Sequence, residues 1–508
     1  MLLMLLAQFG LMLLPALPAS AAPPSSSYLQ LSDISSLRSP GVAAGPVQFA
    51  HVASYMPGRG VGGGDFRFDP ASTAPPDRCN VFAPSAGPGR WTREQVQRGV
   101  QPIENCGADP TGEEDSSVGI AAADTVAAAE SGGVYGGAVT AGRGRFRLDR
   151  AICLHNNVTL SGVSMTATQI FGGPSLNAVD MISNCAAGQE FFALRDIDIV
   201  GGGSVSDALV RMNSVFANSS LQNVLIYASP AVGLRIHNAN GGVSEGMGPI
   251  LFTNVWVNRS ARENVLIDED RSPRSSAASL NFFHLTAENQ GLGYANIAIR
   301  GQRDLATVAF FGLHEEMQGC GPRNAIGIDV DGVSGLTIEA WEFSSTCADT
   351  IGIQIEDNPN NQRIAIHNAK NWNGVKAFIS DRQNGFSTYR NIDYQTPDLG
   401  VLDRGPFNLI FDSAVVFDGA QGSYGILAVL DSKPMVLANP TNVLPGQKIY
   451  FEIVNASNGS IGAVTFGTHF LYGTGSIVWP PRGMRTVLTF FDRDRTGNLV
   501  FLGQSPAS

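Results

Sequence analysis

Between residues 144 and 381 the chain repeats one short pattern, in which apolar and polar residues alternate between bounding Gly, Asn, Asp or Ser residues. NNVTLSGV, ILFTNVWVN and GLTIEAWEF are examples. An alternation with a period of two predicts β-strands. The segments recur roughly every 22 to 30 residues, which indicates stacked repeats. A propeller blade needs about 40 residues and a signature that is missing here, so the pattern predicts a parallel β-helix.

The composition and residue pattern of the sequence change at three places, and these changes divide the chain into four parts. The Ala-rich stretch VGIAAADTVAAAE before Ser131 predicts a helix that covers the first coil of the solenoid. The end of the chain predicts antiparallel strands that form a small β-sandwich cap. We therefore expect a signal peptide, an irregular Gly/Pro-rich module, the parallel β-helix and the cap, at residues 1–21, 22–100, 101–432 and 433–508.

The first 21 residues predict export. An apolar run interrupted by Pro15 and Pro18 ends in Ala19-Ser20-Ala21, which is typical of a secretory signal and its cleavage site. A membrane anchor is the alternative, but no later stretch is long and apolar enough to span a bilayer. We expect a secreted, periplasmic or extracellular protein without stable membrane insertion.

The charge balance restricts the partner. With 44 acidic and 33 basic residues the net charge is −11, which argues against nucleic acid. A polyanionic substrate would need a basic cleft or a bound cation to compensate locally.

A Glu-and-Cys pattern recurs within the predicted solenoid. GLHEEMQGC ends at Cys320 and EAWEFSSTC ends at Cys347. Residues one coil apart lie above one another in a β-helix, so Cys320 and Cys347 are expected to form a disulfide. Cys79 with Cys106 and Cys153 with Cys185 are further pairs that lie close in the sequence.

The same offset places Glu288, Glu315 and Glu342 in one ladder. A second register, which aligns FFHL with FFGL, instead pairs Glu288 with Glu316. Stacked carboxylates raise one another's pKa and could cleave a glycosidic bond as acid and base or nucleophile. They could equally bind Ca²⁺. The structural alternative is a solvated outer face.

Three tryptophans of the solenoid, Trp256, Trp341 and Trp372, are candidates for stacking on sugar rings, with burial in the core as the alternative. Asp196 with Asp198, and Asp329 with Asp331, are candidate cation or sugar ligands, although outward polar residues of a strand are the commoner explanation. His314-Glu315-Glu316 lacks the second His of a zinc helix.

Several motifs resemble those of one superfamily. The motif residues are Gly62-Gly63-Gly64-Asp65-Phe66, Gly89-Arg90-Trp91, Gly107-Ala108-Asp109, Gly144-Arg145-Phe146 and Val158-Thr159-Leu160-Ser161-Gly162. Together with the Ala-rich helix they resemble the opening of pectate lyase-like β-helix proteins, which include phage tailspikes. The resemblance covers roughly residues 30–430 and implies a right-handed parallel β-helix. Tailspikes of this kind often trimerise, so a homotrimer is an expectation that the sequence leaves open.

The resemblance does not select one reaction, because the superfamily includes lyases, hydrolases, epimerases and proteins with no known reaction. We expect an exported protein that binds a polysaccharide along the solenoid and cleaves or modifies it as a hydrolase or lyase. The alternative is a non-catalytic glycan-binding or structural protein. Carboxylates that converge in a cleft would favour the first class.

Overall fold

The structure is a computed structural model of the chain. It describes residues 28–39, 49–131, 136–185, 191–215, 218–238, 248–269, 279–305, 307–318, 325–347, 350–356, 358, 360–361, 363–373, 375–381, 393–395, 407–419, 424–443, 448–471, 477–492 and 498–507. For strand residues 302–304, 371–373, 375–381, 393–395 and 407 only the backbone is described. The expected signal peptide lies outside the described residues and stays a prediction.

The N-terminal module has a small core of its own. Its five-stranded sheet follows the order β1-β2-β3-β5-β4, with bounds Tyr28–Asp33, Phe49–Ser54, Gly62–Asp69, Arg90–Arg93 and Val81–Phe82, and carries helix α1 (Ile34–Leu37). Phe66, Phe68 and Trp91 are buried in it. The aromatic residues of a Gly- and Pro-rich segment therefore pack into a core, as the sequence predicts.

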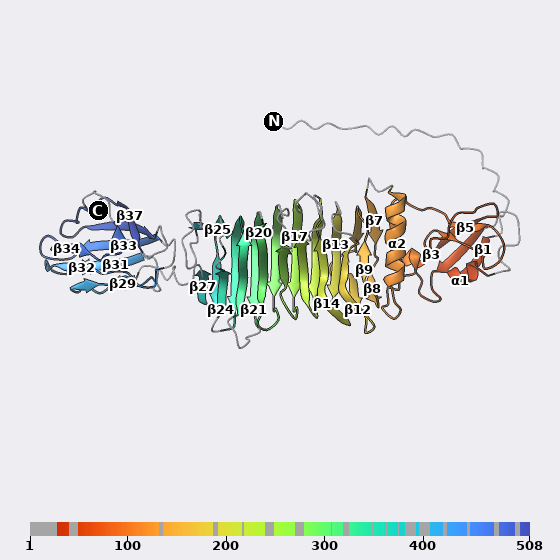
Figure 1. Cartoon of the computed structure of the whole chain (residues 1–508), viewed down its shortest axis with the longest axis horizontal. Coiled ribbons are helices and arrows are strands. Elements are labelled where there is room, and N and C mark those ends of the chain that lie inside the picture. Colours follow the sequence, from red (N-terminus) through yellow and green to blue (C-terminus); the bar gives the residue numbers. More distant parts are fainter. Residues whose placement is uncertain are drawn as a thin grey trace, which may run out of the picture. The chain divides into compact units, whose positions relative to one another are not determined.

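The central part of the chain is a parallel β-solenoid whose strands stack side by side (Figure 1). The larger of its two sheets contains 14 described strands. These are β6 (Val100–Pro102), β7 (Gly137–Thr140), β8 (Gly144–Leu148), β10 (Val158–Ser161), β11 (Thr168–Gly172), β13 (Phe192–Val200), β15 (Ser220–Tyr227), β17 (Ile250–Asn258), β19 (Leu280–Glu288), β21 (Val308–Met317), β23 (Leu336–Ser345), β25 (Ile364–His367), β26 (Lys370–Asn373) and β28 (Asp393–Gln395).

The second sheet of the solenoid contains nine described strands. These are β9 (Ile152–Leu154), β12 (Asn177–Asn184), β14 (Ser204–Asn213), β16 (Val232–Asn238), β18 (Val265–Glu269), β20 (Ala295–Leu305), β22 (Ile326–Val333), β24 (Thr350–Ile355) and β27 (Val375–Asp381). The inward side chains of both sheets form one continuous core. Within it, Phe252, Phe282 and Phe310 stack with ring centroids 4.1 and 4.8 Å apart.

A 3-10 helix, η1 (Ile103–Cys106), and helix α2 (Ser117–Glu130) precede the first full coil. Helix α2 stands across the first strands of the solenoid (Figure 1). Ile120, Ala123 and Ala127 turn from α2 into the solenoid core. The Ala-rich helix thus covers apolar surface that the open end of a repeat array would otherwise expose, as expected from the sequence.

The C-terminal part has a separate core between two sheets. Its strands are β29 (Phe407–Leu409), β30 (Ala414–Val415), β31 (Tyr424–Val429), β32 (Met435–Leu437), β33 (Lys448–Asn455), β34 (Val464–Phe466), β35 (Phe470–Leu471), β36 (Arg485–Asp492) and β37 (Leu499–Gln504). The expected boundary at 433 falls inside these sheets.

The antiparallel pairing expected for the C-terminal part holds for β33, β36 and β37. Strands β29–β31–β33 and β30–β32–β34 instead pair in parallel, in the manner of solenoid coils. The pairing mode cannot be predicted from such short apolar segments, because the side chains of parallel and antiparallel strands both alternate with a period of two.

Among the described residues, no helix has the length and apolar character that crossing a membrane requires.

Candidate functional site

The outward side chains of the larger sheet form rows across successive coils. Strand pairing places Trp256 of β17 beside Thr286 of β19, and Thr286 beside His314 of β21. The same row continues to Glu342 of β23 and Lys370 of β26. Adjacent coils are about 4.8 Å apart, so this row brings an aromatic ring, an imidazole, a carboxylate and an amine onto one line.

A second row bends the strands next to these side chains. Asn254, His284, Gly312, Ala340 and Asn368 take successive positions and all have positive φ, between 51° and 75°. A residue with positive φ bends its strand while the strand stays paired with its neighbours, so the sheet surface becomes concave along this row. A side chain at Gly312 would collide with the ring of His284, since its Cβ would lie 2.9 Å from Nδ1.

The concave surface is an open groove of about 460 Å³. This volume is within the range of small-molecule sites, roughly 300–1,000 Å³. Its lining comes from the two rows just described, with Leu313 between them, and consists of His284, Thr286, Gly312, Leu313, His314, Ala340, Glu342, Asn368 and Lys370. The groove follows the stacking direction of the coils, which is the direction a polymer would need.

His314 is at the centre of a group of carboxylates. Its Nε2 lies 3.7 Å from Glu288 Oε1 and 3.4 Å from Glu316 Oε1. Its Nδ1 lies 3.4 Å from Glu342 Oε2. The imidazole therefore separates Glu342 on one side from Glu288 and Glu316 on the other.

Glu288 is the most shielded of the three carboxylates. Asn258 donates a hydrogen bond to Glu288 Oε2 at 2.8 Å, and Trp256 donates another to the carboxylate. Burial and the nearby Glu316 carboxylate raise the pKa of Glu288 above its ordinary value, against the opposite effects of Trp256 and His314. A carboxyl that keeps its proton near neutrality can act as a general acid.

Three of these groups could also hold a cation. One ligand atom each from Glu288, His314 and Glu316 lies within 4.8 Å of the others. Two carboxylates with an imidazole suit a transition metal better than Ca²⁺, which takes six to eight oxygen ligands. The expectation of Ca²⁺ binding therefore stays a prediction.

The predicted ladder of Glu288, Glu315 and Glu342 is wrong in register. Glu288 pairs with Glu316, and Glu342 pairs with His314. The coil is 28 residues long here, and the ladder assumed 27. Because strand side chains alternate, the shift by one residue turns Glu315 into the core, where it is fully buried. The second register, from the FFHL and FFGL alignment, is the one observed.

The three predicted tryptophans have different positions. Trp256 is exposed on the outer face next to Glu288, with 38% of its surface accessible. Trp341 is buried in the core beside Glu315 and cannot bind a sugar there. The side chain of Trp372 lies outside the described residues, so its role stays a prediction.

Two of the three cysteine pairs considered from the sequence are confirmed. Disulfides join Cys79 to Cys106 and Cys153 to Cys185. Cys347 is disulfide-bonded, but its predicted partner Cys320 lies outside the described residues.

The aspartate pairs have structural contacts. Asp196 has positive φ and accepts a hydrogen bond from Asn223 at 2.8 Å, and Asp198 accepts one from Gln169 at 2.7 Å. On the second sheet, Arg300 donates to Asp329 at 2.6 Å and Asn358 donates to Asp331 at 2.8 Å. These contacts favour the structural explanation of both pairs.

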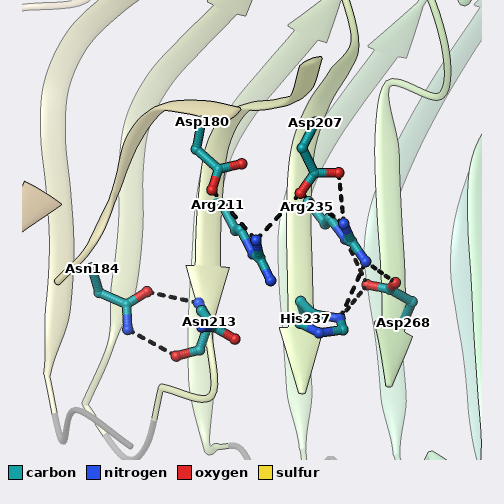
Figure 2. A network of polar contacts seen from close by, with 8 residues as sticks. All are labelled: Asp180, Asn184, Asp207, Arg211, Asn213, Arg235, His237 and Asp268. Carbon is teal, nitrogen blue, oxygen red and sulfur yellow. Dashed lines mark hydrogen bonds and ion pairs between the residues drawn. The ribbon is translucent and has the colours of Figure 1, made fainter. Parts of the chain in front are cut away.

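A second polar cluster lies on the outer face of the smaller sheet (Figure 2). Arg235 contacts Asp207 at 2.6 Å and Asp268 at 2.5 Å, and Arg211 joins Asp207 to Asp180 at 3.4 Å. Its charges are paired. Burial raises the pKa of Asp268, but hydrogen bonds from His237 and Arg235 outweigh this effect, so the pKa is lowered. A carboxylate whose charged form is stabilised in this way suits structural support better than proton transfer.

His314, Glu316 and Lys370 were not predicted as site residues. His314 could have been found, because the FFHL and FFGL alignment puts it in one row with Glu342. Lys370 could have been found in the same way, because it follows Glu342 at the spacing that separates Glu342 from His314.

The comparisons with known proteins agree with this architecture. The chain is a tailspike-like right-handed parallel β-helix protein. The family model of the phage tail protein small four-stranded β-sheet domain matches residues 30–97. No curated protein sequence matches the chain significantly.

Three solved structures share the fold at low sequence identity. Pantoea stewartii WceF, described as a glycan biofilm modifying enzyme, is 12% identical with a TM-score of 0.51. The match covers 73% of this chain and 51% of WceF, so the chain spans about half of that protein. The tailspike gp49 of Acinetobacter baumannii phage Fri1, a capsular polysaccharide depolymerase, is 14% identical with a TM-score of 0.50, and 90% of this chain and 76% of that one are covered.

The gp42 tailspike of Acinetobacter phage vb_AbaP_AS12 is 10% identical with a TM-score of 0.52. There the match covers 92% of this chain and 88% of the tailspike. Sequence identities this low show that the fold is similar and show nothing about activity. The wider pectate lyase-like assignment stays a prediction.

Proposed function

We propose that this chain is an exported protein that binds a polysaccharide in the groove of the larger sheet and hydrolyses one of its glycosidic bonds. The observation that carries the proposal is the position of Glu288, whose pKa is raised, beside His314 of the groove that Glu342 also lines. Acid and base carboxylates with different environments are what glycoside hydrolysis requires.

Glu288 is the general acid in this proposal and Glu342 is the base that activates water. The two carboxylates contact opposite nitrogens of His314, at 3.7 and 3.4 Å. The two contacts and the imidazole between them allow a separation in the range of inverting pairs, roughly 6.5–9.5 Å. Glu316, in the next coil from Glu288, raises the pKa of Glu288 by repulsion.

The remaining groove residues suit a sugar polymer. The exposed ring of Trp256 lies in the same row as the reacting groups, and an aromatic face stacks on the apolar face of a sugar. Lys370 supplies local positive charge, which an acidic polymer would need on a protein of net charge −11.

The fold neighbours support the substrate class. The names of WceF and of the Fri1 tailspike describe action on glycans, and both share the solenoid at a TM-score of 0.50 or more. The two disulfides among the described residues are consistent with an exported protein.

The test is a panel of polysaccharides incubated with the purified chain, with and without Ca²⁺. Reducing ends and the ultraviolet absorbance of unsaturated products are followed together. We expect new reducing ends without new absorbance, independent of added Ca²⁺. Glu288→Gln and Glu342→Gln should each lower the rate about 10²- to 10⁴-fold, whereas the exposed Glu94→Gln should leave it unchanged.

The pH profile of the hydrolysis gives an independent check. The rate should be bell-shaped, because Glu288 must keep its proton and Glu342 must lose its proton. Since the pKa of Glu288 is raised, the alkaline limb should lie above the ordinary range of a carboxyl. Product absorbance that depends on Ca²⁺ would contradict hydrolysis and indicate a lyase.

Glycan binding without cleavage is the second candidate, because the exposed Trp256 in the same row as the groove residues could bind a sugar without any reaction. Binding that is retained when neither reducing ends nor absorbance appear would leave this candidate alone. Trp256→Ala should then still weaken binding, because the exposed ring would be lost.

A further inference from the structure

A second set of reactive side chains lies where helix α2 meets the smaller sheet, far in sequence from the groove residues. In Cys153-Leu154-His155 the strand alternation buries Leu154 and turns Cys153 and His155 to the same outer side. Cys185 follows β12 and its backbone N–H donates to the Leu154 carbonyl at 3.1 Å. The two cysteines form a disulfide at this outer side.

Helix α2 contributes a carboxylate to the same place. Asp124 is almost fully buried, with 1% of its surface accessible, and it accepts a hydrogen bond from the His155 backbone N–H at 3.0 Å. Its Oδ2 also lies 2.5 Å from His155 Nδ1. His155 itself is half exposed, so a small molecule or ion can reach the group.

These side chains are close enough to share one ion. A carboxylate oxygen of Asp124, a ring nitrogen of His155 and Sγ of Cys185 all lie within 4.8 Å of one another. The sulfur of Cys153 is bonded to that of Cys185, so reduction of the disulfide would free a second thiol next to these three groups. Two thiolates, an imidazole and a carboxylate are the ligand types that Zn²⁺ takes in tetrahedral sites.

We propose that, when the Cys153–Cys185 disulfide is reduced, Cys153, Cys185, His155 and Asp124 form a Zn²⁺ site. Reduction by two thiol molecules breaks the S–S bond, gives two cysteine thiols and oxidises the thiols to their own disulfide. Binding of Zn²⁺ then releases the protons of the two thiols. The imidazole and the carboxylate complete four ligands.

The site would join the same segments in both redox states. The disulfide connects the strand segments that hold Cys153 and Cys185, and the metal would connect both of them to α2 through Asp124. Helix α2 covers the first coil, so the end of the solenoid would stay closed in a reducing compartment before export.

The experiment compares Zn²⁺ binding by the full chain before and after reduction with a phosphine, which becomes a phosphine oxide by taking oxygen from water as the disulfide is reduced. Competition with a chromogenic chelator gives the affinity. Co²⁺ in place of Zn²⁺ reports thiolate ligands by a charge-transfer band and tetrahedral geometry by intense visible bands. We expect one tight site in the reduced wild type that the oxidised protein lacks.

Matched variants assign the ligands. His155→Ala and Asp124→Asn should weaken Zn²⁺ binding at least about tenfold, and the double variant Cys153→Ser/Cys185→Ser should abolish the charge-transfer band. The control Cys79→Ser/Cys106→Ser removes the other described disulfide and should keep the site.

Equal affinity in His155→Ala, Asp124→Asn and the wild type would overturn the proposal, as would a reduced wild type that binds no more Zn²⁺ than the oxidised one. Asp124→Asn preserves the shape of the side chain and keeps the test valid if His155→Ala does not fold.

Discussion

At the residue scale, Glu315 shows how much one position can change a side chain's role. It lies between Glu316 and His314, which face the groove, yet its own carboxyl is fully buried. Asn296 donates to its Oε1 at 3.2 Å, and Trp341 also contacts it. Burial raises the pKa of Glu315 to about 8, so this group is protonated at neutral pH.

The raised pKa of Glu315 predicts a pH-dependent stability. Below the ordinary carboxyl pKa of 4.5 both folded and unfolded chains are protonated at this position and the burial has no ionic cost. As the pH rises from 4.5 to about 8, the unfolded chain releases the proton first, so the free energy of unfolding falls by up to about 1.4 kcal/mol per pH unit. Glu315→Gln should remove this decrease.

The measurement is Tm as a function of pH for the wild type, Glu315→Gln and the exposed control Glu114→Gln. The Glu315→Gln curve should separate from the other two above pH 4.5 and become the most stable in alkali. Parallel curves for all three proteins would show that Glu315 does not titrate on unfolding.

At the element scale, the paired charges on β12, β14, β16 and β18 form a ladder that no single strand reveals (Figure 2). Arg235 is its centre, with Asp207 on one side and Asp268 on the other. All three are mostly shielded from water. Breaking such a pair leaves an uncompensated charge, which costs more than the pair itself contributes.

Arg235→Met should therefore destabilise the solenoid by about 3–5 kcal/mol, because Asp207 and Asp268 would lose their shared cation. The exposed Arg145→Met is the control and should cost less than about 1 kcal/mol. Denaturant unfolding of the solenoid measures both. A similar loss of stability in the two variants would mean that the paired charges of the ladder stabilise the protein no more than an exposed charge does.

At the scale of the whole molecule, the sequence predicts the kind of repeat better than the register in which residues of successive coils stack. Strand alternation and the recurring Gly and Asn positions predict the parallel β-helix, and the Ala-rich stretch predicts α2. The coil length decides which residues stack, and it differs between coils because the connecting loops differ. An error of one residue exchanged Glu316 for Glu315.

The contacts that shape the candidate site come from several coils. Glu288 and Trp256 could be proposed from residue type, but the position of His314 between Glu288 and Glu342 depends on the register of β19, β21 and β23. Similarly, nothing in the spacing of Asp124 and Cys185 indicates that α2 brings them together.

The cores of the molecule predict how it unfolds. The solenoid and the C-terminal part have separate hydrophobic clusters, with Phe282 stacked inside the first and Phe451 at the centre of the second. Separate cores unfold as separate cooperative units when few apolar contacts join them. Calorimetry of the full chain should therefore show more than one transition.

Phe282→Ala should lower the solenoid transition and leave the C-terminal one in place, since a deleted core ring costs about 3–5 kcal/mol only in the cluster that contains it. Phe451→Ala is the matched change and should shift only the other transition. Each variant serves as the control for the other, because both remove the same ring from a fully buried position. A single transition lowered by both variants would mean that the two cores unfold together, and the coils of the C-terminal part would then continue the solenoid as one cooperative unit.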